Sequence, residues 1–399
     1  MSGFKADRSS ALRNPLRWLW RGMALLLALS VLVPRLAWEF TAPVPLRVLV
    51  VDKTVPQASF GEHDRVAFWL THRRVPTADG RKVWDVARDY LGYDPIARRG
   101  EAISAERLAG VDLVYLADAY GVYTGDSAEV VAHSTRLAAL ERSTLVYGGL
   151  SLPEVELLES HVARGGSLVA EFNTLEQPTA GSPAGERMGA LLGARYDRWL
   201  MRWYADLASE DEIPSWMRER WERLRGRRWP HRGPGIVVFH ETDERIVVID
   251  STEFTSRWPV TLEVERPDDP LVRRVRSGQP YWYWISAVSP LEGAEVLATF
   301  RLHVTPAAEA RLRRTGFSPS VPAVVRRAGV PLVAYVTGDI ADVGVEPPPL
   351  MRTRYMDWYG RWQAREGRPG PQRRFFWRST LPLWDGMLDE VRALRSRPD

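Results

Sequence analysis

Short runs of apolar, largely β-branched residues recur along the first half of the chain, each ending at a polar residue or a glycine. They lie at 46–51, 111–117, 143–147 and 167–172. Continuous apolar runs of this length are typical of buried parallel strands. Helical periodicity occupies the intervals at 64–71, 81–91, 127–141 and 153–164. Alternating strands and helices predict an α/β fold, with a doubly wound, mostly parallel, flavodoxin-like sheet.

The second half departs from this alternation. Residues 180–233 are rich in Arg, Trp and Glu and are predicted to be an insertion in a domain that covers 43–345. Two runs at 236–239 and 245–249 flank a polar turn and predict a hairpin. Further strands are expected at 260–264, 281–285, 295–303 and 331–336. The extension 346–399 is rich in Pro, Arg and aromatic residues and ends in an apolar helical stripe over 383–394.

The N-terminus carries an apolar segment with a basic flank. Residues 16–38 are predicted to form a transmembrane anchor, extended at both ends by Trp side chains and by Arg21 and Arg35. The basic flank places residues 1–15 in the cytoplasm and the main domain outside it, as in a single-pass protein of the bacterial inner membrane. A cleaved signal peptide and a buried helix are the alternatives. Residues 36–38 make a poor cleavage site, because a tryptophan stands where a small residue is needed.

Charge and composition narrow the range of functions. The first 21 residues carry five basic side chains against one acidic, which accounts for the whole net charge of +4. The remainder is neutral, so nucleic acid is not an expected partner. The chain has no cysteine, which excludes disulfides, thiolate metal sites and a cysteine nucleophile. It also has 17 tryptophans, whose clusters could stack on a sugar or dock a partner protein, or could simply fill the core.

Three segments carry a resemblance to a known family. Residues 150–173 read LSLPEVELLESHVARGGSLVAEFN, and residues 268–275 and 322–342 add a DDPLVRRV segment and a Pro-Ala pair followed by a strand. Together they resemble the class I glutamine amidotransferase-like superfamily, in its trehalose-utilisation-type branch. That resemblance implies a cysteine at the turn after the strand and a later His-x-Glu pair. Here the turn reads Phe172-Asn173-Thr174, and His240 is followed directly by Glu241. Cysteine-dependent glutamine hydrolysis is therefore excluded.

Candidate binding residues follow the predicted strands, because ligands of doubly wound sheets bind beyond the carboxyl ends of the strands. The candidate ligand-binding residues are Asp52, Asp118, Tyr120, Tyr123, Gly148, Gly149, Asn173, Thr174 and Asp339. No catalytic residue is expected; if the protein is an enzyme, the candidates are Asp52, Asp118, Glu171 and His63. In the competing interpretation these polar residues only cap loops and form structural hydrogen bonds. The seven histidines show no metal-type spacing, so neither a metal site nor a cofactor is predicted.

These features together predict a membrane-anchored, periplasm-facing, non-catalytic amidotransferase-like protein that binds a ligand or partner in the cell envelope. The expected partners are the membrane, through residues 16–38, and an envelope glycan or a protein of a membrane complex. Two alternatives stay open. One is an envelope hydrolase that uses the strand-end carboxylates, and the other is a scaffold subunit that docks through residues 180–233 and the C-terminal helix.

Overall fold

A computed structural model describes residues 9–54, 63–76, 84, 89–94, 97, 99–124, 144–329, 331–342, 352–353, 355–363, 365 and 370–396. Within these residues nine strands form one mixed sheet, in the order β13-β12-β15-β16-β17-β8-β5-β1-β2. Its strands are β1 (Val48–Asp52), β2 (Tyr90–Leu91), β5 (Leu113–Asp118), β8 (Ser167–Ala170), β12 (Val260–Val264), β13 (Gln279–Pro280), β15 (Ala294–Leu302), β16 (Ser320–Arg327) and β17 (Val333–Val336).

Only half of this sheet is parallel. Pairing is parallel among β2, β1, β5, β8 and β17 and antiparallel among β17, β16, β15, β12 and β13. Strands β1, β5, β8 and β17 lie where the sequence predicts strands, whereas β2 lies in a segment expected to be helical. The antiparallel half corrects the prediction of a mostly parallel sheet. Between β16 and β17 the chain has only residues 328–332, which is too short for the crossover that a parallel pair requires.

Helices cover both faces of the parallel half. Successive residues of β1 alternate: Val48 and Val50 join a core with α2 (Asp64–His72) and α12 (Leu381–Arg395), while Leu49 and Val51 face a second core. The helices of the second core are α4 (Ala105–Leu108), α6 (Leu152–Ala163) and α7 (Pro183–Leu192). Helix α6 begins with a capping box between Ser151 and Glu154, and α7 ends at Gly193, in the left-handed conformation that favours glycine.

A second, antiparallel sheet has the order β11-β10-β9-β14. Its strands are β9 (Ala194–Tyr204), β10 (Gly235–His240), β11 (Ile246–Asp250) and β14 (Ile285–Pro290), and α8 (Ser215–Arg225) packs on it through Trp216 and Trp221. The predicted hairpin of β10 and β11 is confirmed. Strand β9 lies in the predicted insertion 180–233, but it pairs with β10 and β14, which both lie outside that range. The second sheet therefore contains residues from inside and outside the predicted insertion.

Three predicted elements differ from the structure. Residues 145–147 form β7 (Leu145–Tyr147), which pairs with β6 (Val122–Tyr123) away from the main sheet, because the chain turns back on itself at Gly121 and Gly148. Of the expected strand at 281–285, residues 281–284 connect β13 to β14, with Tyr281 stacked on Phe300, and Ile285 begins β14. In the expected helix 81–91, the last two residues form strand β2. The rest of that helix is mostly outside the described residues, and the expected helix 127–141 is entirely outside them.

The remaining elements lie at the edges of the sheet and at the chain ends. They are β3 (Tyr93–Asp94), β4 (Arg99–Gly100), the 3₁₀ turn Ser251–Glu253, α9 (Pro306–Thr315), α10 (Met356–Gln363), α11 (Pro371–Phe375) and the π-helical turn Phe376–Thr380 that leads into α12. The predicted stripe of α12 is buried, and its Trp384 stacks on Trp69 of α2.

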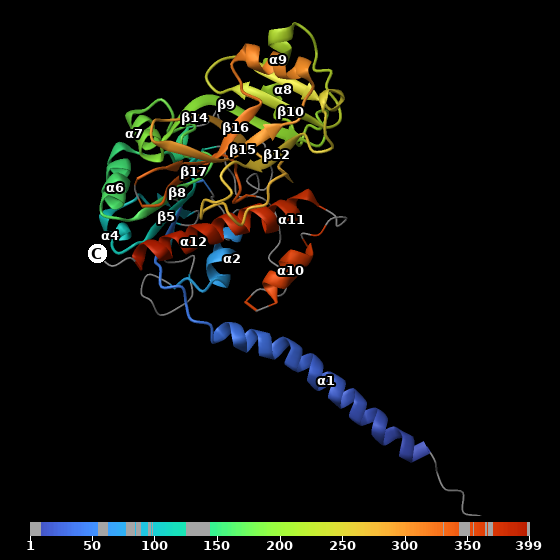
Figure 1. Ribbon diagram of the computed structural model, residues 1–399. Helices are drawn as coiled ribbons and strands as arrows, with labels where there is room; N and C mark the ends of the chain where they lie inside the picture. Colours follow the sequence, from blue (N-terminus) through green and yellow to red (C-terminus); the bar gives the residue numbers. More distant parts are fainter. Residues whose placement is uncertain are drawn as a thin grey trace, which may run out of the picture.

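Helix α1 (Ser9–Glu39) projects from the body (Figure 1). Its segment Arg17–Glu39 is long and apolar enough to cross a membrane, the length and composition also expected of a signal sequence near an N-terminus. The C-terminal end of α1 contacts the body. There the Trp38 indole donates to the carbonyl of His72 at 2.8 Å, and Arg74 donates to the carbonyl of Trp38 at 3.2 Å.

Candidate functional site

The carboxyl ends of four neighbouring parallel strands bring acidic side chains to one edge of the main sheet. Asp52 ends β1 and Asp118 ends β5, while Glu171 directly follows β8 and Asp339 lies three residues after β17. The strands stand side by side in the order β17-β8-β5-β1, so their last residues meet at the same edge. Strand order reverses between β1 and β5, since β2 lies beyond β1. Asp52 and Asp118 therefore flank a topological switch point, where ligands of such sheets bind.

His63 stands at the start of α2 and contacts Asp52. Its Nδ1 lies 2.5 Å from Oδ2 of Asp52, and both side chains are buried. Two further groups hold the carboxylate in place: the Tyr90 hydroxyl donates to Oδ2, and the backbone N–H of Thr54 donates to Oδ1 at 3.0 Å. Asp52 thus has a full set of donors and fixes the orientation of the imidazole.

The other ring nitrogen of His63 faces Asp342. Nε2 lies 3.1 Å from Oδ1 of Asp342, but the two atoms are not aligned for a hydrogen bond, and neither has another partner among the described residues. Asp339 completes the group: ligand atoms of His63, Asp339 and Asp342 all lie within 4.8 Å of one another.

His63 and Asp52 each stabilise the charged form of the other. Burial alone would lower the pKa of His63, but the carboxylates of Asp52 and Asp342 outweigh it and hold that pKa well above its usual value. Burial alone would likewise raise the pKa of Asp52, but the charge of His63 and the hydrogen bonds from His63, Tyr90 and Thr54 lower it. His63 and Asp52 therefore form a buried ion pair in this state.

The remaining carboxyl groups have raised pKa values, which favour their neutral, protonated form. Burial, with repulsion from Asp52, raises the pKa of Asp118 to about 6, and burial raises the pKa of Glu171 to about 8. Burial also raises the pKa of Asp339 well above its usual value, with added repulsion from Asp342 and Asp118. The strongest charges on these three groups come from one another, from neighbouring Asp52 and Asp342, and from His63. No lysine or arginine of the described residues is among them.

Glu171 reaches the segment that carries the other two acids. Its Oε2 accepts the backbone N–H of Ala341 at 3.0 Å, between Asp339 and Asp342. Its Oε1 is buried and has no hydrogen-bond partner in the described part of the chain. The indole N–H of Trp384 is near enough to lower the pKa of Glu171, but it donates to the Tyr115 hydroxyl at 2.7 Å.

Asn173 occupies the sharp turn after β8. Its φ is 65°, a left-handed conformation that asparagine tolerates better than most residues, and its side-chain amide donates to Asp118 Oδ2 at 2.9 Å. Asp118 also accepts from the Thr54 hydroxyl at 2.5 Å. Thr174 is fully buried, and its hydroxyl has no hydrogen-bond partner in the described part of the chain.

Other predicted site residues form the loops around the cluster. The backbone N–H of Tyr120 donates to Asp118 at 2.6 Å, and the ring of Tyr120 packs on that of Tyr123. Gly148 and Gly149 both have positive φ. A Cβ on Gly148 would lie 2.2 Å from Gly121 Cα, so this glycine is needed for the close approach of two loops. Gly149 donates its N–H to the carbonyl of Ala119 at 2.7 Å.

Sequence reasoning missed three contributors: Thr54, Tyr90 and Asp342. Tyr90 was hidden because its segment is periodic enough to predict a helix. Asp342 had a usable signal, since it follows Asp339 by three residues in a polar stretch after a buried strand. Thr54 likewise follows Asp52 by two residues, a spacing typical of a turn that closes on an aspartate.

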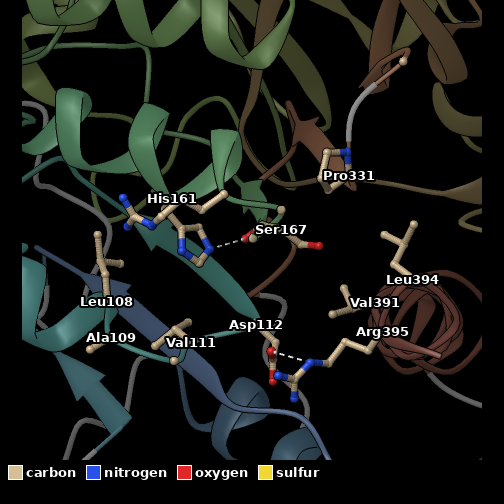
Figure 2. A pocket seen from close by; sticks show the side chains of 15 residues that line it. Leu108, Ala109, Val111, Asp112, His161, Ser167, Pro331, Val391, Leu394 and Arg395 are labelled. Atoms are coloured by element: carbon tan, nitrogen blue, oxygen red, sulfur yellow. Dashed lines mark hydrogen bonds and ion pairs between the residues drawn. The ribbon is translucent and has the colours of Figure 1, made fainter. Parts of the chain in front are cut away.

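A pocket of about 820 Å³ lies at the opposite edge of the sheet, where β5 and β8 begin (Figure 2). There Arg395 of α12 pairs with Asp112 at 2.9 Å, and His161 contacts the carbonyl of Ser167 at 3.2 Å. Asp112 also accepts the backbone N–H of Arg47, so its charge is used to join α12 to the sheet. The pocket is separate from the acidic cluster.

Comparison with known proteins gives a likeness of fold. No family model and no curated protein matches the chain. Among solved structures, a ThuA-like protein from Bacteroides uniformis is 11% identical, with 75% of this chain and 84% of that one covered and a TM-score of 0.35. A glutamine amidotransferase from Thermotoga maritima is 10% identical, with 88% and 94% covered and a TM-score of 0.31.

A β-galactosidase from Bacillus circulans is 12% identical over 74% of this chain, with a TM-score of 0.33. The match spans only 29% of that enzyme.

The cluster can hold protons and attract cations. Several carboxyl groups share a buried space with a single imidazole, so a positive charge that enters relieves both their repulsion and their desolvation. The turn residue Asn173 has no nucleophilic atom, and its amide is used to hold Asp118.

Proposed function

We propose that this protein is a membrane-anchored, extracytoplasmic, non-catalytic member of the amidotransferase-like fold group that binds a positively charged ligand at the cluster of Asp52, His63, Asp118, Glu171, Asp339 and Asp342. One observation carries the proposal: five carboxyl groups of these residues surround one imidazole. Such a site favours a cation, because a positive charge would pair with the acids that burial otherwise holds neutral, whereas a neutral or anionic ligand would not.

Three features support the rest of the proposal. Counted along the chain, the parallel strands lie in the order 2-1-3-4-5, the order of flavodoxin-like sheets, whose ligands sit at the switch point. Asn173 stands at the turn where the resemblance implies a nucleophile. The apolar α1 and the basic residues before it favour insertion with the N-terminus in the cytoplasm and the body outside.

Four residues of the aromatic clusters do not support a sugar as the ligand. Trp199, Tyr204, Tyr281 and Trp284 are buried, and their rings contact other core rings. They therefore supply core packing, and charge at the cluster is the better guide to the ligand.

Thermal unfolding of the detergent-solubilised full chain tests the proposal. The panel contains spermidine, glucosamine and divalent metal ions as cations, with glucose and glucuronate as the neutral and anionic controls. A cation present at 100 times its Kd stabilises the folded state by about 2.7 kcal/mol. Stabilisation by a cation but not by either control supports the proposal. Stabilisation by glucuronate or glucose, or by nothing in the panel, contradicts it.

A second candidate is a hydrolase, favoured by the opposite pKa shifts of Asp52 and Asp118, which Thr54 bridges. Two carboxyl groups with separated pKa values can divide the roles of base and acid. Turnover of an envelope glycan that Asp52→Asn abolishes would favour this candidate. Retention of that turnover in the variant would remove it.

A further inference from the structure

The geometry points to a divalent transition-metal site formed by Nε2 of His63 and carboxylate oxygens of Asp339 and Asp342. This inference rests on the proposed function and names its ligand class: an ion such as Zn²⁺ or Mn²⁺. Three independent features of the cluster carry it.

The first feature is the support behind His63. A histidine that binds a metal through one ring nitrogen almost always donates the other N–H to a carboxylate or carbonyl, which fixes its tautomer and orientation. Nδ1 of His63 has such a partner in Asp52 at 2.5 Å, and Asp52 is itself held by Tyr90 and Thr54. Nε2 is therefore the ring nitrogen whose proton a metal ion would displace, and it faces Asp342. Asp52 is the positioning residue in this arrangement.

The second feature is the spacing of the donor atoms. Two ligands about 2.1 Å from one ion stand about 3.0–3.4 Å apart, depending on whether the geometry is octahedral or tetrahedral. Nε2 of His63 and Oδ1 of Asp342 are 3.1 Å apart without hydrogen-bond alignment, as neighbouring ligands of one ion would be. An atom of Asp339 lies within 4.8 Å of both.

The third feature is Glu171. Its side chain is fully buried, its Oε2 is fixed to the backbone between the two acidic ligands, and its Oε1 has no hydrogen-bond partner in the described residues. Glu171 can supply a fourth oxygen or accept a hydrogen bond from a ligand on the ion.

The donor set selects the metal class. One imidazole with two or three carboxylates suits Zn²⁺, Mn²⁺ or another first-row ion, whereas Ca²⁺ and Mg²⁺ take oxygen ligands. The chain has no cysteine, so thiolate coordination cannot account for any metal that it binds.

Equilibrium dialysis with metal analysis tests the site. The detergent-solubilised full chain is stripped with EDTA and then dialysed against Zn²⁺, Mn²⁺, Mg²⁺ or Ca²⁺. We expect one Zn²⁺ or Mn²⁺ per chain and weaker binding of Mg²⁺ and Ca²⁺. We also expect at least a 10-fold loss of affinity in Asp342→Asn.

The chain offers a matched control. Nδ1 of His240 lies 3.0 Å from Asp243, so Asp243→Asn also removes a carboxylate that contacts a histidine, but at the end of β10. Metal affinity should be unchanged in this variant. Equal losses in Asp342→Asn and Asp243→Asn would overturn the assignment.

X-ray absorption of the unmodified Zn²⁺ complex decides the matter if Asp342→Asn does not fold. One imidazole and otherwise oxygen ligands are expected, and two or more imidazoles would overturn the site. Failure of Zn²⁺ and Mn²⁺ to bind, together with stabilisation by spermidine or glucosamine, overturns the metal and leaves the proposed function standing. Failure of every cation removes both.

Discussion

The side-chain amide of Asn173 donates to Asp118 at 2.9 Å from a backbone position with φ of 65°. One residue thus makes the tight turn after β8 and ties that turn to the end of β5. Few side chains do both, because the left-handed conformation disfavours residues with a bulky Cβ substituent and the hydrogen bond needs a short donor.

Substitutions at Asn173 should separate these two roles. Asn173→Ala loses the hydrogen bond and keeps the backbone strain, so we expect the free energy of unfolding to fall by about 2 kcal/mol. Asn173→Gly loses the same hydrogen bond but relieves the backbone, and should cost about 1 kcal/mol less. Urea unfolding of the two variants measures the difference. An alanine variant as stable as the glycine variant would show that the turn is not strained.

Glu176 should make stability depend on pH. Burial raises its pKa to about 7, and Tyr335 donates to its Oε1 at 2.9 Å. The folded protein therefore keeps a proton that the unfolded chain releases above its ordinary pKa near 4.5. The stabilisation is complete below about pH 4.5 and is lost as the pH rises toward 7. Glu176→Gln should flatten the stability profile in this window, whereas an unchanged profile would contradict the assignment.

The buried pair of Lys53 and Glu154 offers a second stability test. Lys53 Nζ lies 2.7 Å from Glu154 Oε1, and it also donates to the carbonyl of Gly149 at 2.8 Å. Lys53→Met leaves the Glu154 charge without its cation, which should cost about 3–5 kcal/mol.

The double variant Lys53→Met/Glu154→Gln is the control, because it removes both charges. It should recover part of that loss in urea unfolding at pH 7. If the single and double variants unfold alike, the charge of Glu154 is not what the lysine stabilises.

The absence of cysteine gives a clean test of membrane topology. In a Ser396→Cys variant, a membrane-impermeant maleimide should label the thiol in intact spheroplasts, because the body is proposed to lie outside the cytoplasm. Ser396 is exposed at the end of α12. A Ser2→Cys variant should be labelled only after lysis. The reverse pattern would invert the proposed orientation, and release of the body into the soluble periplasmic fraction would indicate a cleaved signal.

Local sequence patterns predicted those parts of the fold that local physics determines. The runs ending at Asp52 and Asp118 are buried parallel strands, and the helical periodicity at 153–164 belongs to α6. The wrong prediction at 281–285 arose because four consecutive aromatic residues suit a strand as well as a core connection. What distinguishes the core connection from a strand is the packing of Tyr281 on Phe300 and on Phe375 of the C-terminal extension. Both partners are far from Tyr281 in the sequence.

The candidate site was predictable in part for the same reason. Strand ends share an edge, so Asp52, Asp118 and Asp339 could be grouped from topology alone. The contact of Asp342 with His63 joins positions 279 residues apart, and no periodicity encodes it. The absence of histidine spacing in the sequence argued against metal, yet a site assembled from separate loops needs no such spacing.

The contacts of Trp38 attach the C-terminal end of α1 to the body next to α2. Trp38 is bonded to the last residue of α2, His72, and the first residue of α2 directly follows His63. Helix α2, which has nine residues and is about 13 Å long, thus lies between the C-terminal end of α1 and the imidazole of His63. Trp38 is buried, and Arg74 donates to its carbonyl, so this end of α1 is attached to the body by side-chain contacts as well as by the chain itself. The C-terminal end of α1 is therefore held against the C-terminal end of α2, at the opposite end of that helix from His63.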